Sequence, residues 1–172
     1  MNWFALTVKP QHESAAARAL GAFDIPAYVP LYSERRRWSD RVKLIEAPLI
    51  PGYVFARFTR LERPVVLKAH GVRSVVQFAG EPAPVADREL DSIRTLIAAG
   101  FPLEPWEGLV PGESVSIDAG PLAGARGVFL RRRDQFCLAV SVELLGRSVI
   151  ATVNREDVFP VSPKSLSRAA TG

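Results

Sequence analysis

The stretch from Pro111 to Pro160 is punctuated by glycines, and their spacing constrains the fold more than any other feature of the chain. Glycine adopts backbone conformations that other residues avoid, so it marks positions where a chain turns tightly. Between these glycines lie short segments rich in β-branched and aromatic residues, as is typical of strands. The expected strands are 114–117, 125–131, 136–142, 148–153 and 158–159. Short strands separated by turns predict a small β-barrel at residues 109–162.

The first hundred residues alternate between strand-like and helix-like patterns. Residues 2–8 are β-rich, and residues 11–20 and 87–99 carry apolar side chains at helical spacing. Together with further strand-like runs, they predict an α/β sandwich in which helices lie on one or both faces of a mixed sheet. Residues 101–108 are rich in proline and glycine, as linkers often are. The expected organisation is an α+β chain with an N-terminal domain at 1–100, a linker at 101–108, a barrel at 109–162 and a flexible tail at 163–172.

Composition narrows the class of protein. Of the 172 residues 48% are hydrophobic, which is ample for a core, and no stretch approaches the length of a membrane span. The only cysteine, Cys137, cannot form an internal disulfide, and the N-terminus does not resemble a signal peptide, so we expect a cytoplasmic protein. His12 and His70 have no partners at metal-ligand spacing. We therefore expect neither an enzyme nor a bound cofactor or metal.

Two blocks of residues lie in order along the chain: Trp3, Pro51-Gly52-Tyr53-Val54-Phe55, Gly71-Val72, Gly80, Pro82 and Pro84, then Gly112, Gly120-Pro121-Leu122, Gly124, Gly127 and Gly146-Arg147. Together they resemble the NusG family of transcription elongation and antitermination factors. The C-terminal block looks like a KOW domain, which in that family is an SH3-like β-barrel. Ala119 replaces the usual aspartate before Gly-Pro, and Leu145 replaces a common aromatic residue, so the chain looks more like the specialised members than the housekeeping one.

The resemblance implies a contact with RNA polymerase near Pro51, Tyr53 and Phe55. In the family this part of the N-terminal domain docks on the clamp helices of the largest subunit. Tyr53 and Phe55 share one face of a strand, and an exposed aromatic pair suits an interface. The other interpretation is that both rings are ordinary core residues.

A basic run with an embedded tryptophan indicates contact with nucleic acid. Five basic side chains against two acidic ones leave a local net charge of +3 between residues 34 and 43. Arginine binds phosphate and an indole can stack on an unpaired base, which suits the non-template or upstream DNA of a transcription bubble. The other interpretation is a solvated hairpin. The candidate residues are Arg35, Arg36, Arg37, Trp38, Arg41 and Lys43.

The C-terminal domain is expected to recruit a second factor, such as the ribosome or Rho. Its expected partner face consists of Phe136, Leu144, Leu145 and Arg147, and the other interpretation is that most of these are core residues. Residues 131–133 indicate a charged hairpin loop, and the other interpretation is a contact with RNA or a partner protein. The resulting hypothesis is a monomeric factor that binds RNA polymerase and suppresses pausing or termination. The alternatives are a ribosome-associated RNA-binding KOW protein and a structural adaptor without nucleic-acid contact.

Overall fold

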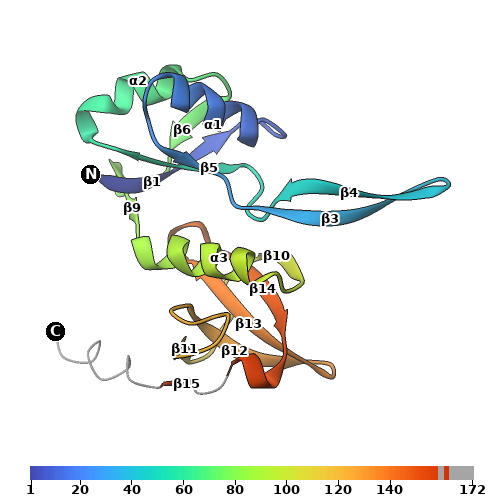
Figure 1. Ribbon diagram of the computed structural model, residues 1–172. Helices are drawn as coiled ribbons and strands as arrows, with labels where there is room; N and C mark the ends of the chain where they lie inside the picture. The colour runs from blue at the N-terminus through green and yellow to red at the C-terminus, as the bar shows by residue number, and fades with distance from the viewer. Residues whose placement is uncertain (159–160, 163–172) are drawn as a thin grey trace, which may run out of the picture. The chain divides into compact units, whose positions relative to one another are not determined.

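The computed structural model describes residues 1–158 and 161–162, and the chain divides into two compact units. The first unit is Met1–Ala86 and the second begins at Asp87 (Figure 1). None of the described helices is long and apolar enough to cross a membrane. The mixture of helices and sheets is consistent with the expected α+β class.

The first unit is built on an antiparallel sheet with strand order β2-β5-β1-β6. Its strands are β1 (Asn2–Val8), β2 (Ala27–Tyr28), β5 (Tyr53–Phe58), β6 (Val72–Val75) and β9 (Pro84–Val85). β6 and β9 share one edge of β1, pairing with its C-terminal and N-terminal halves. The sheet is not mixed as expected, because β5 lies between β1 and β2 and runs antiparallel to both. The connection from β1 through α1 to β2 therefore crosses over β5.

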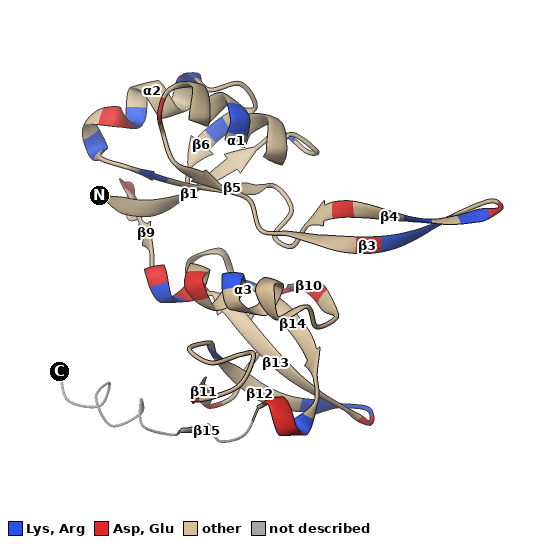
Figure 2. Cartoon of the chain, in the orientation of Figure 1, with Lys and Arg blue, Asp and Glu red and all other residues tan. Residues whose placement is uncertain are grey.

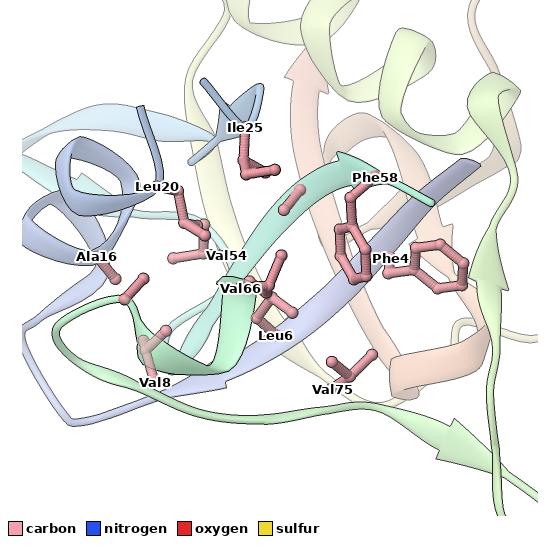
Figure 3. Close-up of a cluster of buried hydrophobic side chains, with 12 residues drawn as sticks. Phe4, Leu6, Val8, Ala16, Leu20, Ile25, Val54, Phe58, Val66 and Val75 are labelled. Carbon is pink, nitrogen blue, oxygen red and sulfur yellow. The ribbon is translucent and has the colours of Figure 1, made fainter. Parts of the chain in front are cut away.

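One face of this sheet is covered by two helices, α1 (Glu13–Ala22) and α2 (Arg63–Lys68). A short 3-10 turn, η1 (Arg60–Glu62), precedes α2 and is closed by a capping box between Thr59 and Glu62. Alternate residues of β1 and β5 point toward these helices, as the period of a strand requires (Figure 3). The buried cluster consists of Phe4, Leu6, Val8, Ala16, Leu20, Ile25, Val54, Ala56, Phe58, Val66, Ala69 and Val75.

A two-stranded hairpin extends from the first unit (Figure 1). It consists of β3 (Leu31–Trp38) and β4 (Arg41–Pro48), which pair with each other and with no other described strand. The expected strand at 27–32 is divided by Pro30, whose carbonyl instead accepts a hydrogen bond from the Leu49 amide (2.9 Å). A second small hairpin is formed by β7 (Gln77–Phe78) and β8 (Glu81–Pro82).

The second unit combines a helix, α3 (Asp87–Ala99), with a six-stranded antiparallel sheet of order β10-β14-β13-β12-β11-β15. Two 3-10 turns, η2 (Glu143–Leu145) and η3 (Arg155–Asp157), flank β14. Over the described residues the path of paired strands is open, from β10 to β15, so the closed barrel is not found there. The strands are β10 (Leu103–Glu107), β11 (Ser114–Ile117), β12 (Arg126–Arg132), β13 (Gln135–Val142), β14 (Arg147–Val153) and β15 (Val161–Ser162).

The division between the units differs from the expected boundary at 101–108. α3, expected in the N-terminal domain, lies against β12 and β13. Ser92 Oγ accepts a hydrogen bond from the Arg126 amide (3.0 Å), and the Glu89 carboxylate accepts one from the Glu143 amide (3.2 Å). The segment expected as a linker instead forms β10, which pairs with β14 along its whole length. Backbone pairing there outweighs the proline-rich composition, since an edge strand needs only one hydrogen-bonded side.

The expected strands agree with β11, β12, β13 and β14 to within one residue at each end. The expected strand at 158–159 is not found at Val158, which ends a 3-10 turn, and Phe159 lies outside the described residues. The expected tail at 163–172 also lies outside them.

Candidate nucleic-acid interface

The hairpin β3–β4 has two faces of different chemistry. Directly opposite residues of an antiparallel pair lie on the same face, and the pairing runs from Leu31 with Pro48 to Trp38 with Arg41. The tryptophan face therefore carries Glu34, Arg36, Trp38, Arg41, Lys43 and Ile45. The aliphatic face carries Ser33, Arg35, Arg37, Val42, Leu44 and Glu46.

The tryptophan face combines an exposed aromatic ring with three cations. Trp38 is 58% exposed at the end of β3. Arg36 lies 3.4 Å from Glu34 and Arg41 lies 4.0 Å from Asp40, both as exposed ion pairs. Such pairs contribute little to stability and exchange readily, so both guanidinium groups remain available to phosphate. This face can bind phosphate through Arg36, Arg41 and Lys43 while the indole stacks on a base.

Lysine and arginine gather toward the free end of the hairpin (Figure 2). The six residues expected to bind nucleic acid thus lie on one element, but Arg35 and Arg37 lie on the opposite face from Trp38. The sequence did not reveal which face Arg41 and Lys43 share, because that depends on where the turn falls. The run of three arginines shows only that neighbours point in opposite directions within a strand.

The three residues expected to contact RNA polymerase differ in exposure. Pro51 is exposed and Tyr53 is half-buried, whereas Phe55 is buried. The expected exposed aromatic pair is therefore not present. Phe55 pairs in register with Ala5 of β1, which is also buried, so for Phe55 the alternative interpretation of a core residue applies. The composition of the strand alone did not distinguish these two positions.

Glu13 supports the turn that precedes Tyr53, and sequence reasoning missed it. The Gly52 amide donates a hydrogen bond to Glu13 Oε1 (2.9 Å), and the Gly52 carbonyl accepts one from the Val8 amide (3.0 Å). Glu13 is buried at the start of α1. A buried carboxylate that holds a backbone amide fixes the entry of β5, and with it the positions of Pro51 and Tyr53.

The residues expected to form the C-terminal partner face do not form one site. Phe136 pairs with Val153 at one end of the β13–β14 hairpin, whereas Arg147 pairs with Val142 at the other. Phe136 and Val142 are six positions apart along β13, so the two ends lie roughly 20 Å apart. Leu144 and Leu145 lie in η2, next to Arg147 and half-buried like it. Phe136 instead stacks on Phe129, with ring centroids 5.5 Å apart.

The basic loop at residues 131–133 is engaged within its own unit. Arg131 pairs with Asp134 (3.7 Å) and lies over the Phe136 ring. Arg132 forms an ion pair with Glu104 and lies over Trp106, 5.1 Å from the ring centroid. These contacts favour the interpretation of this segment as a charged hairpin loop.

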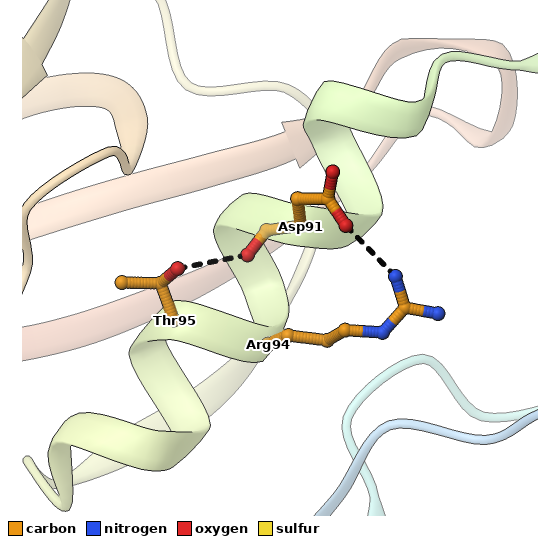
Figure 4. A network of polar contacts seen from close by, with 3 residues as sticks. All are labelled: Asp91, Arg94 and Thr95. Carbon is orange, nitrogen blue, oxygen red and sulfur yellow. Dashed lines mark hydrogen bonds and ion pairs between the residues drawn. The ribbon is translucent and has the colours of Figure 1, made fainter.

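The side chains considered as catalytic or metal-binding candidates, Cys137, Asp91, His12 and His70, are buried or contact neighbouring side chains. Burial raises the pKa of the Cys137 thiol. Asp91 pairs with Arg94 one turn along α3 (2.9 Å), and its carbonyl accepts a hydrogen bond from Thr95 (Figure 4). The His12 and His70 rings lie 5.7 Å apart. Among the described residues, no group of three or more His, Cys, Asp or Glu side chains is arranged to hold a metal ion.

Comparison with known proteins identifies the family. The model of the NusG family, described as transcription termination factor nusG, matches residues 1–94, which is more than half of the chain. A solved structure concerning domain interaction in Thermotoga maritima NusG has a similar fold, with a TM-score of 0.53 and 21% identity. The alignment covers 95% of this chain and 97% of that one.

The chain is also similar to the MjSpt4:Spt5 complex, in conformation A, with 17% identity and a TM-score of 0.33. That alignment covers 93% of this chain and 96% of the other. No curated protein sequence matches the chain significantly. The family match ends within α3 and confirms the resemblance seen in the sequence. This chain therefore belongs to the NusG family of transcription factors.

Proposed function

We propose that this protein is a transcription elongation or antitermination factor. It binds RNA polymerase through its first unit, suppresses pausing or termination, and recruits a second factor through its second unit. The observation that carries the proposal is the tryptophan face, a basic and aromatic surface within the matched family domain. Membership of the NusG family makes nucleic acid held by RNA polymerase the natural ligand of that surface.

The polymerase contact involves the start of β5. Pro51 and Tyr53 are accessible there, and the Glu13 hydrogen bond holds their turn in place. A half-buried tyrosine offers a large ring and a polar hydroxyl at little entropic cost, which is the chemistry of an interface anchor. The partner is the pair of clamp helices of the largest subunit, and Phe55 takes no part in the contact.

The tryptophan face contacts the non-template or upstream DNA. Arg36, Arg41 and Lys43 supply phosphate contacts, and Trp38 supplies stacking on an unpaired base. Binding through phosphates releases counterions, so affinity for duplex DNA falls with salt at a log–log slope of about −0.9 per neutralised phosphate. A flat salt response would indicate an adaptor without nucleic-acid contact.

The second unit acts as a KOW module. The surface formed by Leu144, Leu145 and Arg147 is half-buried beside the Gly146 turn, and it offers the ribosome or Rho an apolar contact with one cation. Phe136 belongs to a different part of the sheet and is not included in this surface.

The test combines polymerase binding with a pausing assay. Wild-type protein should bind core RNA polymerase and shorten the lifetime of paused complexes. Tyr53→Ala should weaken polymerase binding, by about tenfold if the ring is a typical anchor. Trp38→Ala should leave binding to the free enzyme unchanged and reduce the effect on pausing.

Two outcomes would contradict the proposed function. Failure of the folded wild-type protein to bind polymerase would exclude it. Co-sedimentation with ribosomes in the absence of polymerase binding would support the ribosome-associated alternative instead.

A further inference from the structure

The aliphatic face of the hairpin exposes two apolar side chains side by side. Val42 is 62% exposed and Leu44 is 67% exposed, and both lie on β4 two residues apart. Arg37 lies directly opposite Val42, and Arg35 directly opposite Leu44. Because β3 and β4 form a sheet of their own, no packed layer is available within it to bury these side chains.

The two faces also differ in how their arginines are neutralised. On the tryptophan face Arg36 and Arg41 each have a carboxylate within 4.0 Å. On the aliphatic face no ion pair to Arg35 or Arg37 is found within the part of the chain that the structure describes. The aliphatic face is therefore an apolar pair flanked by two arginines, and among the described residues neither arginine forms an ion pair with Glu46, the carboxylate on this face.

This chemistry suits a protein rather than a nucleic acid. A phosphate backbone gains nothing from exposed valine and leucine, whereas the centres of protein interfaces combine apolar side chains with arginine. A complementary surface would place carboxylates on either side of an apolar side chain, since charged pairs across an interface specify orientation. The occupant that fits is an acidic protein surface with an apolar centre.

We propose that the aliphatic face docks on such a surface of RNA polymerase itself. The inference rests on the proposed function, in which the hairpin holds nucleic acid on its tryptophan face. A two-stranded sheet has side chains on both sides, so nucleic acid can occupy one face while protein covers the other. The hairpin is then a two-sided wedge between the enzyme and its DNA, and it provides a polymerase contact separate from Tyr53.

The test measures two affinities for each variant of the full chain. One is the affinity for core RNA polymerase without nucleic acid, and the other is the affinity for a single-stranded DNA oligonucleotide at low salt. Val42→Thr with Leu44→Thr removes the apolar pair and places at both positions a β-branched residue that favours a strand. Arg36→Gln with Lys43→Gln is the matched pair on the tryptophan face.

We expect the threonine variant to bind polymerase about tenfold more weakly, with oligonucleotide affinity unchanged. The matched glutamine variant should show the reverse. Arg35→Glu with Arg37→Glu leaves the apolar pair in place and should also weaken polymerase binding. This charge variant serves as the test if circular dichroism shows that the threonine variant has lost structure.

Three results would overturn the proposal or its basis. Unchanged polymerase affinity in both aliphatic-face variants would exclude the docking contact while leaving the proposed function intact. Loss of oligonucleotide binding in the threonine variant would assign this face to nucleic acid. Absence of wild-type binding to polymerase would overturn the proposed function, and the docking contact with it.

Discussion

Gly127 is the glycine whose replacement by alanine should cost the second unit most. A Cβ atom at Gly127 would lie 3.0 Å from the carbonyl carbon of Ala139 and closer still to its oxygen. Ordinary contacts between carbon atoms are about 3.5–4.0 Å. Both neighbouring atoms are backbone of β13, so the clash cannot be relieved by a side-chain rotation. β12 and β13 would have to separate by at least about 0.5 Å at this point.

The expected loss is about 3 kcal/mol of unfolding free energy. Overpacking a close contact costs about 1–3 kcal/mol, and each strand hydrogen bond weakened by the separation adds about 1 kcal/mol. An opposing effect is smaller: alanine restricts the unfolded chain and would stabilise by about 0.4–1 kcal/mol if the backbone accepted it. Because Gly127 does not have a left-handed φ, the penalty is entirely steric.

The control is Gly124→Ala, which tests the other reason for a glycine. Gly124 has a φ of +88°, and nothing lies within 4 Å of the position that a Cβ atom would occupy there. Only backbone strain therefore opposes alanine at Gly124, at about 1 kcal/mol. Urea denaturation and hydrogen exchange of the β13 amides in the full chain should rank the variants as wild type, Gly124→Ala, then Gly127→Ala. A Gly127→Ala protein as stable as wild type would refute the reasoning.

Three further predictions concern titratable groups that folding buries wholly or in part. Glu13→Ala should destabilise the first unit by about 1–3 kcal/mol in urea denaturation because the Gly52 amide loses its acceptor. Glu13→Gln keeps a carbonyl oxygen that can accept this hydrogen bond, so equal losses in the two variants would contradict the prediction. Burial raises the pKa of Glu89, so the folded state holds the proton of this carboxyl more tightly than the unfolded chain does. The stability of the second unit should therefore fall as pH rises from the ordinary pKa of glutamate to the raised pKa of Glu89. Glu89→Gln should flatten this slope in thermal denaturation, and an unchanged slope would exclude Glu89 as its source. Cys137 should react with iodoacetamide far more slowly in the folded chain than in urea, and equal rates would contradict its burial.

Local signals in the sequence were sufficient for most of the elements. The bounds of β1 and α3 agree with the expected ranges, and β11 to β14 follow the glycine spacing. These elements depend on side-chain period and on residues that end or begin them, all of which lie within a few positions. What the sequence could not show is which elements pair. β10 lies in the expected linker because β14, more than forty residues later, provides a partner for its backbone.

The candidate site shows the same division. The basic run with Trp38 was visible in the sequence, since charge and aromatic character belong to individual residues. Neighbours such as Arg37 and Trp38 point to opposite faces of any strand, but the placement of Arg41 and Lys43 on the face of Trp38 required the register of the hairpin. Likewise, Phe136 and Arg147 are close enough in sequence to suggest one surface, but the β13–β14 pairing places them at opposite ends of a hairpin.

The family and the strand-and-turn character of the chain follow from its sequence, because glycine positions, apolar period and charge runs are local properties. Three features required the folded chain: α3 lies against β12 and β13, Phe55 is buried, and the hairpin has two chemically different faces. The faces of the hairpin are set by where its turn falls, which residue character alone does not fix. The packing of α3 and the burial of Phe55 are set by contacts between residues far apart in the chain. No window of the sequence contains both partners of such a contact.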